Sequence, residues 1–149
     1  MLGVIWFVQV VHYPLFAGVG QVNFPIYEQR HTFLTGFVVM PPMVLELVTA
    51  LMLCAATRCR IPESDARRLL TLTVLIWTTT FALHVPQHQA LTTGYDEQVH
   101  ELLVATNWLR TLLWSLKALL CASLLNRMLH PVTVSEQEHA AELVAARAD

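Results

Sequence analysis

Hydrophobic residues gather into four long runs along the chain, separated by short polar stretches. The runs cover about residues 1–20, 32–56, 67–89 and 98–129. Each run holds about 20 mainly apolar residues, which is the length at which an α-helix crosses the hydrocarbon layer of a bilayer. Strands of a membrane barrel would alternate apolar and polar residues over about 10 positions, and these runs do not. The pattern predicts four membrane-spanning helices.

The composition supports this interpretation. Of the 149 residues, 55% are hydrophobic and 13% are charged, whereas about 25% are charged in an ordinary soluble domain. The first run exceeds a secretion-signal core in length and has no basic residues before it, so we expect it to be retained. We therefore predict an all-α fold: one integral membrane four-helix bundle over residues 1–130, with short loops. The net charge of −2 indicates no nucleic-acid partner.

Basic residues in the loops predict the orientation of the bundle. The loop between the second and third runs carries Arg58, Arg60, Arg67 and Arg68, the first loop carries only Arg30, and the third has no basic residue. Lys and Arg are kept on the cytoplasmic side of a membrane. We therefore expect the arginine-rich loop and both chain termini to be cytoplasmic.

The last stretch, residues 131–149, is predicted to be a cytoplasmic tail. Ser135 is followed three residues later by Glu138. This is the spacing of a capping box, in which each side chain bonds a free backbone amide at the start of a helix. We therefore expect a short helix in the tail.

Polar side chains within each run fall on one face of the predicted helix, at 100° per residue. These faces contain, run by run, Gln9, His12 and Tyr13; His31, Thr35, Glu46 and Thr49; Thr73, Trp77, Thr80 and His84; and Asn107, Arg110, Thr111, Trp114 and Lys117. Polar side chains in a membrane tend to face the bundle interior or a wet cavity. Helix packing through hydroxyl and ring side chains is the alternative explanation.

The depths of these residues predict an outward-opening pocket above an ion pair. His12 and Arg110 lie about 12 Å from the outer ends of their helices, and His84 lies within about 8 Å. Glu46 and Lys117 both lie about 22 Å deep, so we expect them to form a buried ion pair. The pair would either fix the helix register or handle protons.

The histidines raise the alternatives of haem and metal binding. His12 and His84 are on different predicted helices, as bis-histidine haem ligation requires. His84 and His88 have the i, i+4 spacing of two metal ligands, with His31 available as a third. However, Pro86 interrupts that spacing. The only acids placed near that level are the predicted loop residues Glu28, Asp96, Glu97 and Glu101.

We expect no bound cofactor and assign no metal ligands, and the haem and metal alternatives remain open. Residues His88, His31 and His100 are expected to lie at the rim of the pocket, bonded to neighbours or lipid headgroups. Neither a glycine-rich phosphate loop nor a catalytic GxSxG or HExxH motif occurs.

Three stretches carry a family resemblance: "HTFLTGFVVMPPMVLEL", "WTTTFALHVPQHQALTTGYDEQ" and "TNWLRTLLWSLKALL". Together they resemble a group of small, mostly bacterial four-helix membrane proteins of unknown function, which is similar to the anthrone-oxygenase-like superfamily. The resemblance implies the bacterial inner membrane as the location. Superfamily members of known activity oxidise a reduced aromatic polyketide to its quinone without metal or flavin. The positions that match the shared motifs are Glu46, His88, Asn107, Trp108 and Arg110.

Together the polar faces and the resemblance predict a pocket for a lipophilic aromatic or quinone-like molecule, with a cofactor-independent oxidation as its reaction. The residues expected to bind the ring are Tyr13, Trp77, His88, Trp108 and Trp114. His84 or His12 would take the ligand's hydroxyl proton. Arg110 and Asn107 would stabilise the resulting oxyanion.

A second hypothesis belongs to a different class of function. In it, the chain is a non-catalytic accessory subunit of a larger membrane complex or a homo-oligomeric scaffold. The polar faces would then only hold helices together. Apart from the bilayer, its partners would be other protein chains rather than a small molecule.

Overall fold

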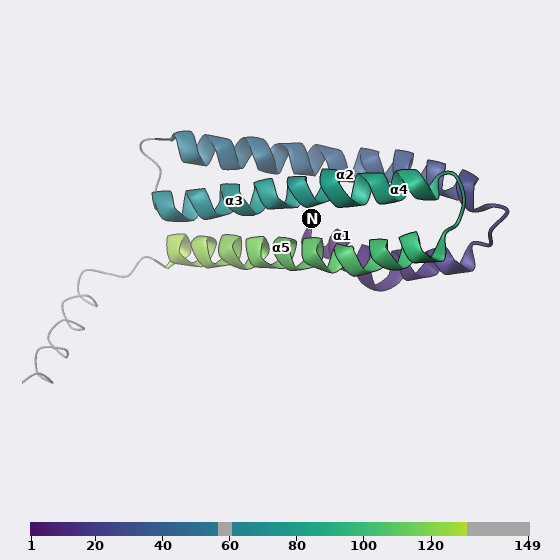
Figure 1. Cartoon of the computed structure of the whole chain (residues 1–149). Helices are drawn as coiled ribbons and strands as arrows, with labels where there is room; N and C mark the ends of the chain where they lie inside the picture. Colours follow the sequence, from purple (N-terminus) through teal and green to yellow (C-terminus); the bar gives the residue numbers. More distant parts are fainter. Residues whose placement is uncertain (57–60, 131–149) are drawn as a thin grey trace, which may run out of the picture.

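The computed structural model describes residues 1–56 and 61–130, and within these residues the chain is helical, with no strand (Figure 1). The elements in chain order are α1 (Leu2–Phe7), the π-helix η1 (Val8–His12), the 3-10 helix η2 (Pro14–Gly18), α2 (Phe24–Ala55), α3 (Glu63–Thr79), the π-helix η3 (Thr80–His84), α4 (Val85–Leu91) and α5 (Glu97–Leu129).

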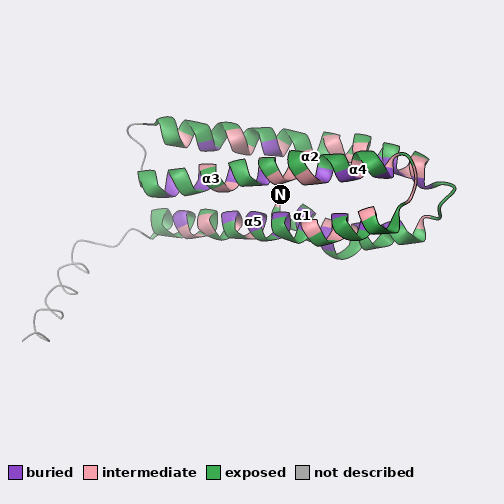
Figure 2. Cartoon of the chain, viewed as in Figure 1, coloured by how far each residue is buried: buried purple, intermediate pink, exposed green. Residues whose placement is uncertain are grey.

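Three long helical rods form the body of the molecule. They are α2, the continuous rod α3–η3–α4 over Glu63–Leu91, and α5, and each is long and apolar enough to cross a membrane. Successive rods run in opposite directions and lie side by side (Figure 1). Their outward faces are exposed, while the buried residues face one another (Figure 2). Large apolar side chains such as Phe37 and Leu119 are 68% exposed, as expected of surfaces that contact lipid tails.

The first segment differs from the prediction of a complete span over residues 1–20. Its helical stretch, Leu2–Gly18, is shorter than the other rods, and it begins about midway along the bundle (Figure 1). The segment packs along α5. Four helical segments therefore surround the interior only in the half of the bundle that contains the loops at 19–23 and 92–96. The other half is built from three rods.

Prolines explain why two segments depart from α-helix geometry. The π-helices end at His12 and His84, and each is followed by one residue and then a proline, Tyr13-Pro14 and Val85-Pro86. A proline has no amide hydrogen, and its ring clashes with the carbonyl four residues earlier. In both places the residue before the proline instead bonds five residues back, Tyr13 to Val8 and Val85 to Thr80. Such π-bulges are frequent at functional sites.

Two apolar clusters form the core. One lies toward the middle of the bundle and consists of Ile5, Met43, Ile76, Leu113 and Trp114. The other lies toward the loops at 19–23 and 92–96 and consists of Tyr13, Phe16, Phe24, Leu91 and Leu103. The second cluster attaches the first segment to α2, α4 and α5, and therefore positions the histidines near it.

Charged residues connect α3 and α5 at the end of the bundle away from the loops at 19–23 and 92–96. Asp65 in the first turn of α3 is buried and accepts hydrogen bonds from Arg68, at 2.8 Å, and from Arg127 of α5, at 3.5 Å. Two further arginines of the predicted cytoplasmic loop, Arg58 and Arg60, lie outside the described residues, as does the helix predicted in residues 131–149.

Candidate functional site

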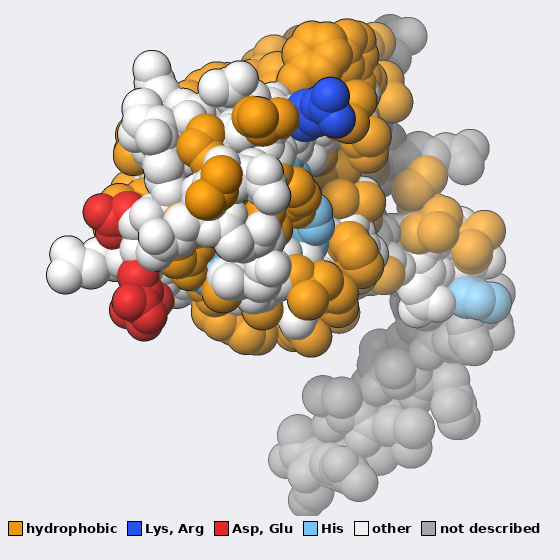
Figure 3. All heavy atoms as spheres, turned by 90° about the vertical axis from the view of Figure 1, so that its right-hand side faces the viewer, with side chains coloured by type: hydrophobic (Ala, Val, Ile, Leu, Met, Phe, Trp, Pro, Cys, Tyr) orange, Lys and Arg blue, Asp and Glu red, His pale blue; other side chains and the backbone are white. Residues whose placement is uncertain are grey.

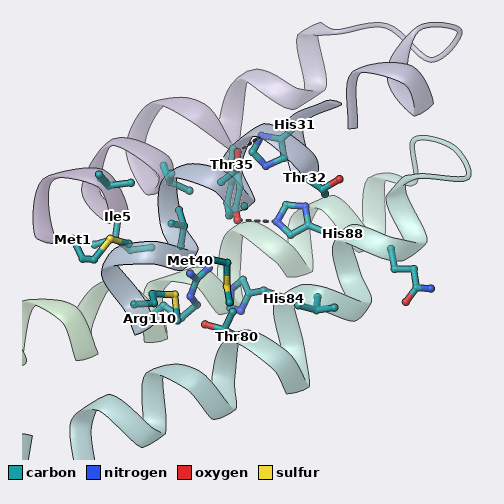
Figure 4. Close-up of a pocket in the computed structure, with 18 of the residues that line it drawn as sticks. Met1, Ile5, His31, Thr32, Thr35, Met40, Thr80, His84, His88 and Arg110 are labelled. Carbon is teal, nitrogen blue, oxygen red and sulfur yellow. Dashed lines mark hydrogen bonds between the residues drawn. The ribbon is translucent and has the colours of Figure 1, made fainter. Parts of the chain in front are cut away.

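A cavity of about 380 Å³ lies in the half of the bundle where four helical segments meet. Its walls are mainly apolar and come from α1, η1, α2 and α4, with Ile5, Val39 and Met43 among them. Its polar side chains are Tyr13, His31, His84, His88 and Arg110. Figure 4 shows Arg110 and His84 on one side of this space and His31 and His88 on another. An apolar cavity with a few polar groups is the usual form of a small-molecule site.

Arg110 brings a cation into this cavity without an acidic partner. The residue is 6% exposed, and its Nη1 donates a hydrogen bond of 3.2 Å to Asn107 Oδ1. Its Nε is buried and makes no hydrogen bond. No carboxylate among residues 1–56 and 61–130 forms an ion pair with it. A buried cation with a free donor favours a ligand that presents an oxygen with negative charge.

His84 brings an unpartnered acceptor to the same cavity. It ends the π-helix η3, and its Nδ1 lies 3.1 Å from the Thr79 carbonyl oxygen. A carbonyl can only accept, so Nδ1 carries the proton and the neutral ring presents the lone pair of Nε2. That atom is buried without a partner. His84 is therefore placed to receive a proton from a bound hydroxyl group.

A hydrogen-bonded chain of polar groups lies beside these residues. His88 Nδ1 is 2.5 Å from Glu28 Oε1, and His88 Nε2 is 2.9 Å from the Tyr13 hydroxyl. His31 Nδ1 lies 2.9 Å from His12 Nε2 and 3.1 Å from Thr35 Oγ1. The prediction that Glu28 is a loop residue is wrong, because α2 begins at Phe24 and buries this carboxylate completely.

Seen from the end of the bundle that holds the loops at 19–23 and 92–96, histidine side chains are visible near the centre of the face (Figure 3). The visible acidic and basic side chains lie nearer the edges of that face. The histidines of the hydrogen-bonded chain, His12, His31 and His88, are called the histidine cluster below. They lie toward this end of the bundle, on η1, the first part of α2 and α4. The prediction that the histidines gather toward one end agrees with this placement.

Two of the predicted catalytic residues do not line the cavity. His12 turns to His31, at 2.9 Å, and stacks edge-on against Phe16 with ring centres 5.2 Å apart. Asn107 is fully buried and holds Gln9 and Arg110 by hydrogen bonds of 2.9 and 3.2 Å. Both residues therefore position other side chains. The haem alternative is not supported, because His12 and His84 do not face a common space.

The three predicted tryptophans do not line the cavity either. Trp108 is 45% exposed and packs edge-to-face on Trp6, with ring centres 5.8 Å apart. Trp77 is half-buried and packs beside Phe81. Trp114 belongs to the core, one turn deeper than Arg110. Of the predicted ring-binding residues, only Tyr13 and His88 line the cavity.

Glu46 and Lys117 are paired as predicted, with Glu46 Oε2 and Lys117 Nζ 2.5 Å apart. The pair lies in the half of the bundle built from three rods, beside a second cavity of about 420 Å³ that reaches Met1 and Cys121. The side chain of Lys117 is 9% exposed and that of Glu46 is 29% exposed. The acid is therefore less buried than predicted, and the pair lies apart from the histidine cluster.

Sequence reasoning missed Glu28 although the signal was present. Glu28 and His31 form a Glu-x-x-His sequence, whose i, i+3 spacing places both side chains on one helix face. In four-helix bundles this spacing occurs among carboxylate and histidine metal ligands. Glu28 had been assigned to the first loop because it lies between two apolar runs, but α2 begins at Phe24, with Pro25 in its first turn, where proline is well accommodated.

Comparison of the chain with protein-family models, with curated proteins and with solved structures finds no match. The resemblance to the anthrone-oxygenase-like superfamily therefore stays a prediction.

Proposed function

We propose that this protein resides in a bacterial inner membrane and binds a lipophilic phenol, hydroquinone or quinone in the 380 Å³ cavity. The observation that carries the proposal is the pair of unpartnered buried nitrogens, Arg110 Nε and His84 Nε2, on residues that line an otherwise apolar space. An apolar ring system suits the walls. A hydroxyl group on that ring donates a hydrogen bond to His84 Nε2, and its oxygen accepts one from Arg110 Nε.

The two nitrogens have complementary roles toward a ring hydroxyl. His84 Nε2 accepts the hydroxyl proton, since Nδ1 already donates to the Thr79 carbonyl. Arg110 then donates to the phenolate oxygen, and this interaction is strong because the guanidinium is buried. Asn107 holds the guanidinium in place. The expected role of Asn107 at the oxyanion thus becomes a positioning role.

Deprotonation prepares a hydroquinone for oxidation, and we propose this as the reaction of the site. The hydroquinone gives up two electrons and two protons and becomes the quinone. Dioxygen accepts both and becomes hydrogen peroxide. The reaction needs no bound cofactor, in line with the family that the sequence resembles.

The orientation is part of the proposal. Arg67, Arg68 and Arg127 lie at the end of the bundle opposite the histidine cluster. By the retention of basic residues inside the cell, that end of the bundle, where α5 ends, is cytoplasmic. The N-terminus, predicted to be cytoplasmic as well, instead lies about midway along the bundle. The cavity then lies in the outer half of the membrane, where a lipophilic ligand enters from the bilayer.

Binding of an alkyl hydroquinone to the purified protein in detergent with EDTA tests the proposal. We expect Arg110→Gln and His84→Gln each to weaken binding about 10- to 100-fold, since a hydrogen bond to a charged group contributes about 1.5 to 3 kcal/mol. His130→Ala, which changes an exposed histidine outside the cavity, serves as the control. The same alkyl chain on a benzene ring without hydroxyls should bind all variants equally. Equal hydroquinone affinities for the wild type and both cavity variants would contradict the proposal.

A further inference from the structure

Three metal-ligating side chains come together at the end of the cavity. Glu28, His31 and His88 each offer one donor atom, and these atoms all lie within 4.8 Å of one another. Two come from α2, where the i, i+3 spacing puts them on the same face, and the third comes from α4. The cluster therefore depends on the tertiary fold and does not arise from one helix alone.

The second nitrogen of each imidazole has a partner of its own. His88 Nε2 is held by the Tyr13 hydroxyl at 2.9 Å, which leaves Nδ1, 2.5 Å from Glu28 Oε1, facing the carboxylate. His31 Nδ1 is held by His12 and Thr35, which leaves Nε2 as its free nitrogen. Metal-binding histidines are typically oriented in this way, by a hydrogen bond from the ring nitrogen that does not bind the ion.

One of the two oxygens of the Glu28 carboxylate has no partner. Glu28 is fully buried, and its Oε2 makes no hydrogen bond. A buried charged oxygen without a donor is costly in a low-dielectric interior. A cation beside Glu28 would satisfy this atom, and His31 and His88 would complete the donor set.

We propose that Glu28, His31 and His88 bind one divalent first-row transition-metal ion. Two imidazoles with one carboxylate suit Fe(II), Mn(II) or Zn(II), whereas Mg²⁺ and Ca²⁺ prefer sites composed of oxygen atoms. Tyr13, His12 and Thr35 orient the ligands. Because His84 lies outside this set, the site differs from the His84–His88 pair considered from the sequence. The proposal does not depend on the nature of the ligand in the cavity.

Ion binding should tighten the cluster. Bonds of about 2.1 Å to a metal keep neighbouring donors about 3 Å apart, while the three donors are spread over as much as 4.8 Å. Extended X-ray absorption of the Zn(II)-loaded protein should therefore show two nitrogen neighbours and at least one oxygen neighbour at about 2.0 to 2.1 Å.

The test is a titration of the full chain with Zn(II) alone, after removal of metals with EDTA, against a chromophoric competitor. We expect one ion per chain for the wild type, an affinity at least 100-fold lower for Glu28→Gln, and 10- to 100-fold lower for Tyr13→Phe, which touches no ion. His130→Ala and Glu63→Gln, both exposed, remove the same chemical groups elsewhere and should bind as the wild type does.

Two results would overturn the proposal: a wild type that binds no stoichiometric Zn(II), or a Glu28→Gln variant that binds it as tightly as the wild type. Circular dichroism confirms that each variant is folded. The hydroquinone assay contains EDTA, so its result does not depend on a metal. If the protein binds hydroquinone but no Zn(II), only the metal-site proposal is contradicted. If the protein binds Zn(II) but no hydroquinone, only the proposed function is contradicted.

Discussion

His88→Leu should lower the free energy of unfolding of the metal-free protein by about 3 to 5 kcal/mol, the usual result of removing the partner of a buried carboxylate. Glu28 is fully buried, and its Oε1 contacts His88 Nδ1 at 2.5 Å. Leucine leaves this carboxylate with no donor on either oxygen, since Oε2 is already unpartnered. The Tyr13 hydroxyl loses its partner as well. The measurement is reversible unfolding in mixed micelles by titration with a denaturing detergent.

The double variant Glu28→Gln/His88→Leu is the control for this result. A neutral amide costs less to bury than a carboxylate, so the double variant should recover at least half of the lost stability. If the double variant were less stable than His88→Leu, the unpartnered Glu28 carboxylate would not be the cause of the loss.

The second large effect is expected at Asn107. This residue is fully buried and joins η1 to α5, since its side-chain amide donates to Gln9 Oε1 at 2.9 Å and its Oδ1 accepts from Arg110 at 3.2 Å. Gln9 in turn donates to the Val104 carbonyl at 3.2 Å. Asn107→Ala leaves the buried guanidinium and the Gln9 oxygen poorly satisfied. We expect destabilisation of about 3 kcal/mol, because each unsatisfied buried group costs about 1 to 3 kcal/mol.

Asn126→Ala is the matched control for Asn107→Ala. Asn126 lies on the same helix, is exposed, and contributes only its backbone carbonyl to the bond from His130. Its replacement should change stability by less than about 0.5 kcal/mol. The two variants are compared by the same unfolding titration. Equal stability of both would show that the Gln9–Asn107–Arg110 network does not hold the first segment on α5.

The sequence predicted the long rods because their signal is length and apolarity, which the membrane imposes directly. The incomplete first segment was not predictable in the same way. Residues 1–20 are as apolar as a span, but their helical stretch covers only Leu2–Gly18 and changes from α to π to 3-10 geometry along its length. Where that segment begins along the bundle depends on packing against α5.

Some residues of the cavity could be predicted from the sequence because the helical period shows which side chains share a face. Arg110, His84, Tyr13 and His88 meet at one cavity because the helical period places polar side chains on the inner face. Trp108 was expected at the ring because it belongs to a shared family motif, but it lies about 100° around α5 from the inward Asn107 and faces outward. Glu28 was missed because the start of a helix is hard to place from sequence, and the metal cluster depends on it.

Gly36→Leu tests the central claim, that the cavity is the ligand site, most directly. Gly36 lines the cavity, and a side chain added there meets no atom within 4 Å. Gly3 is equally open but lies outside the cavity, so Gly3→Leu changes the same residue type without filling the site. Leucine also has a better helix propensity than glycine, so neither variant should lose stability.

The measurement is the dissociation constant of the alkyl hydroquinone for both variants. We expect Gly36→Leu to bind roughly 10- to 100-fold more weakly, equivalent to about 1 to 3 kcal/mol of overpacking, and Gly3→Leu to bind as the wild type does. Unchanged affinity in a folded Gly36→Leu protein would contradict the account.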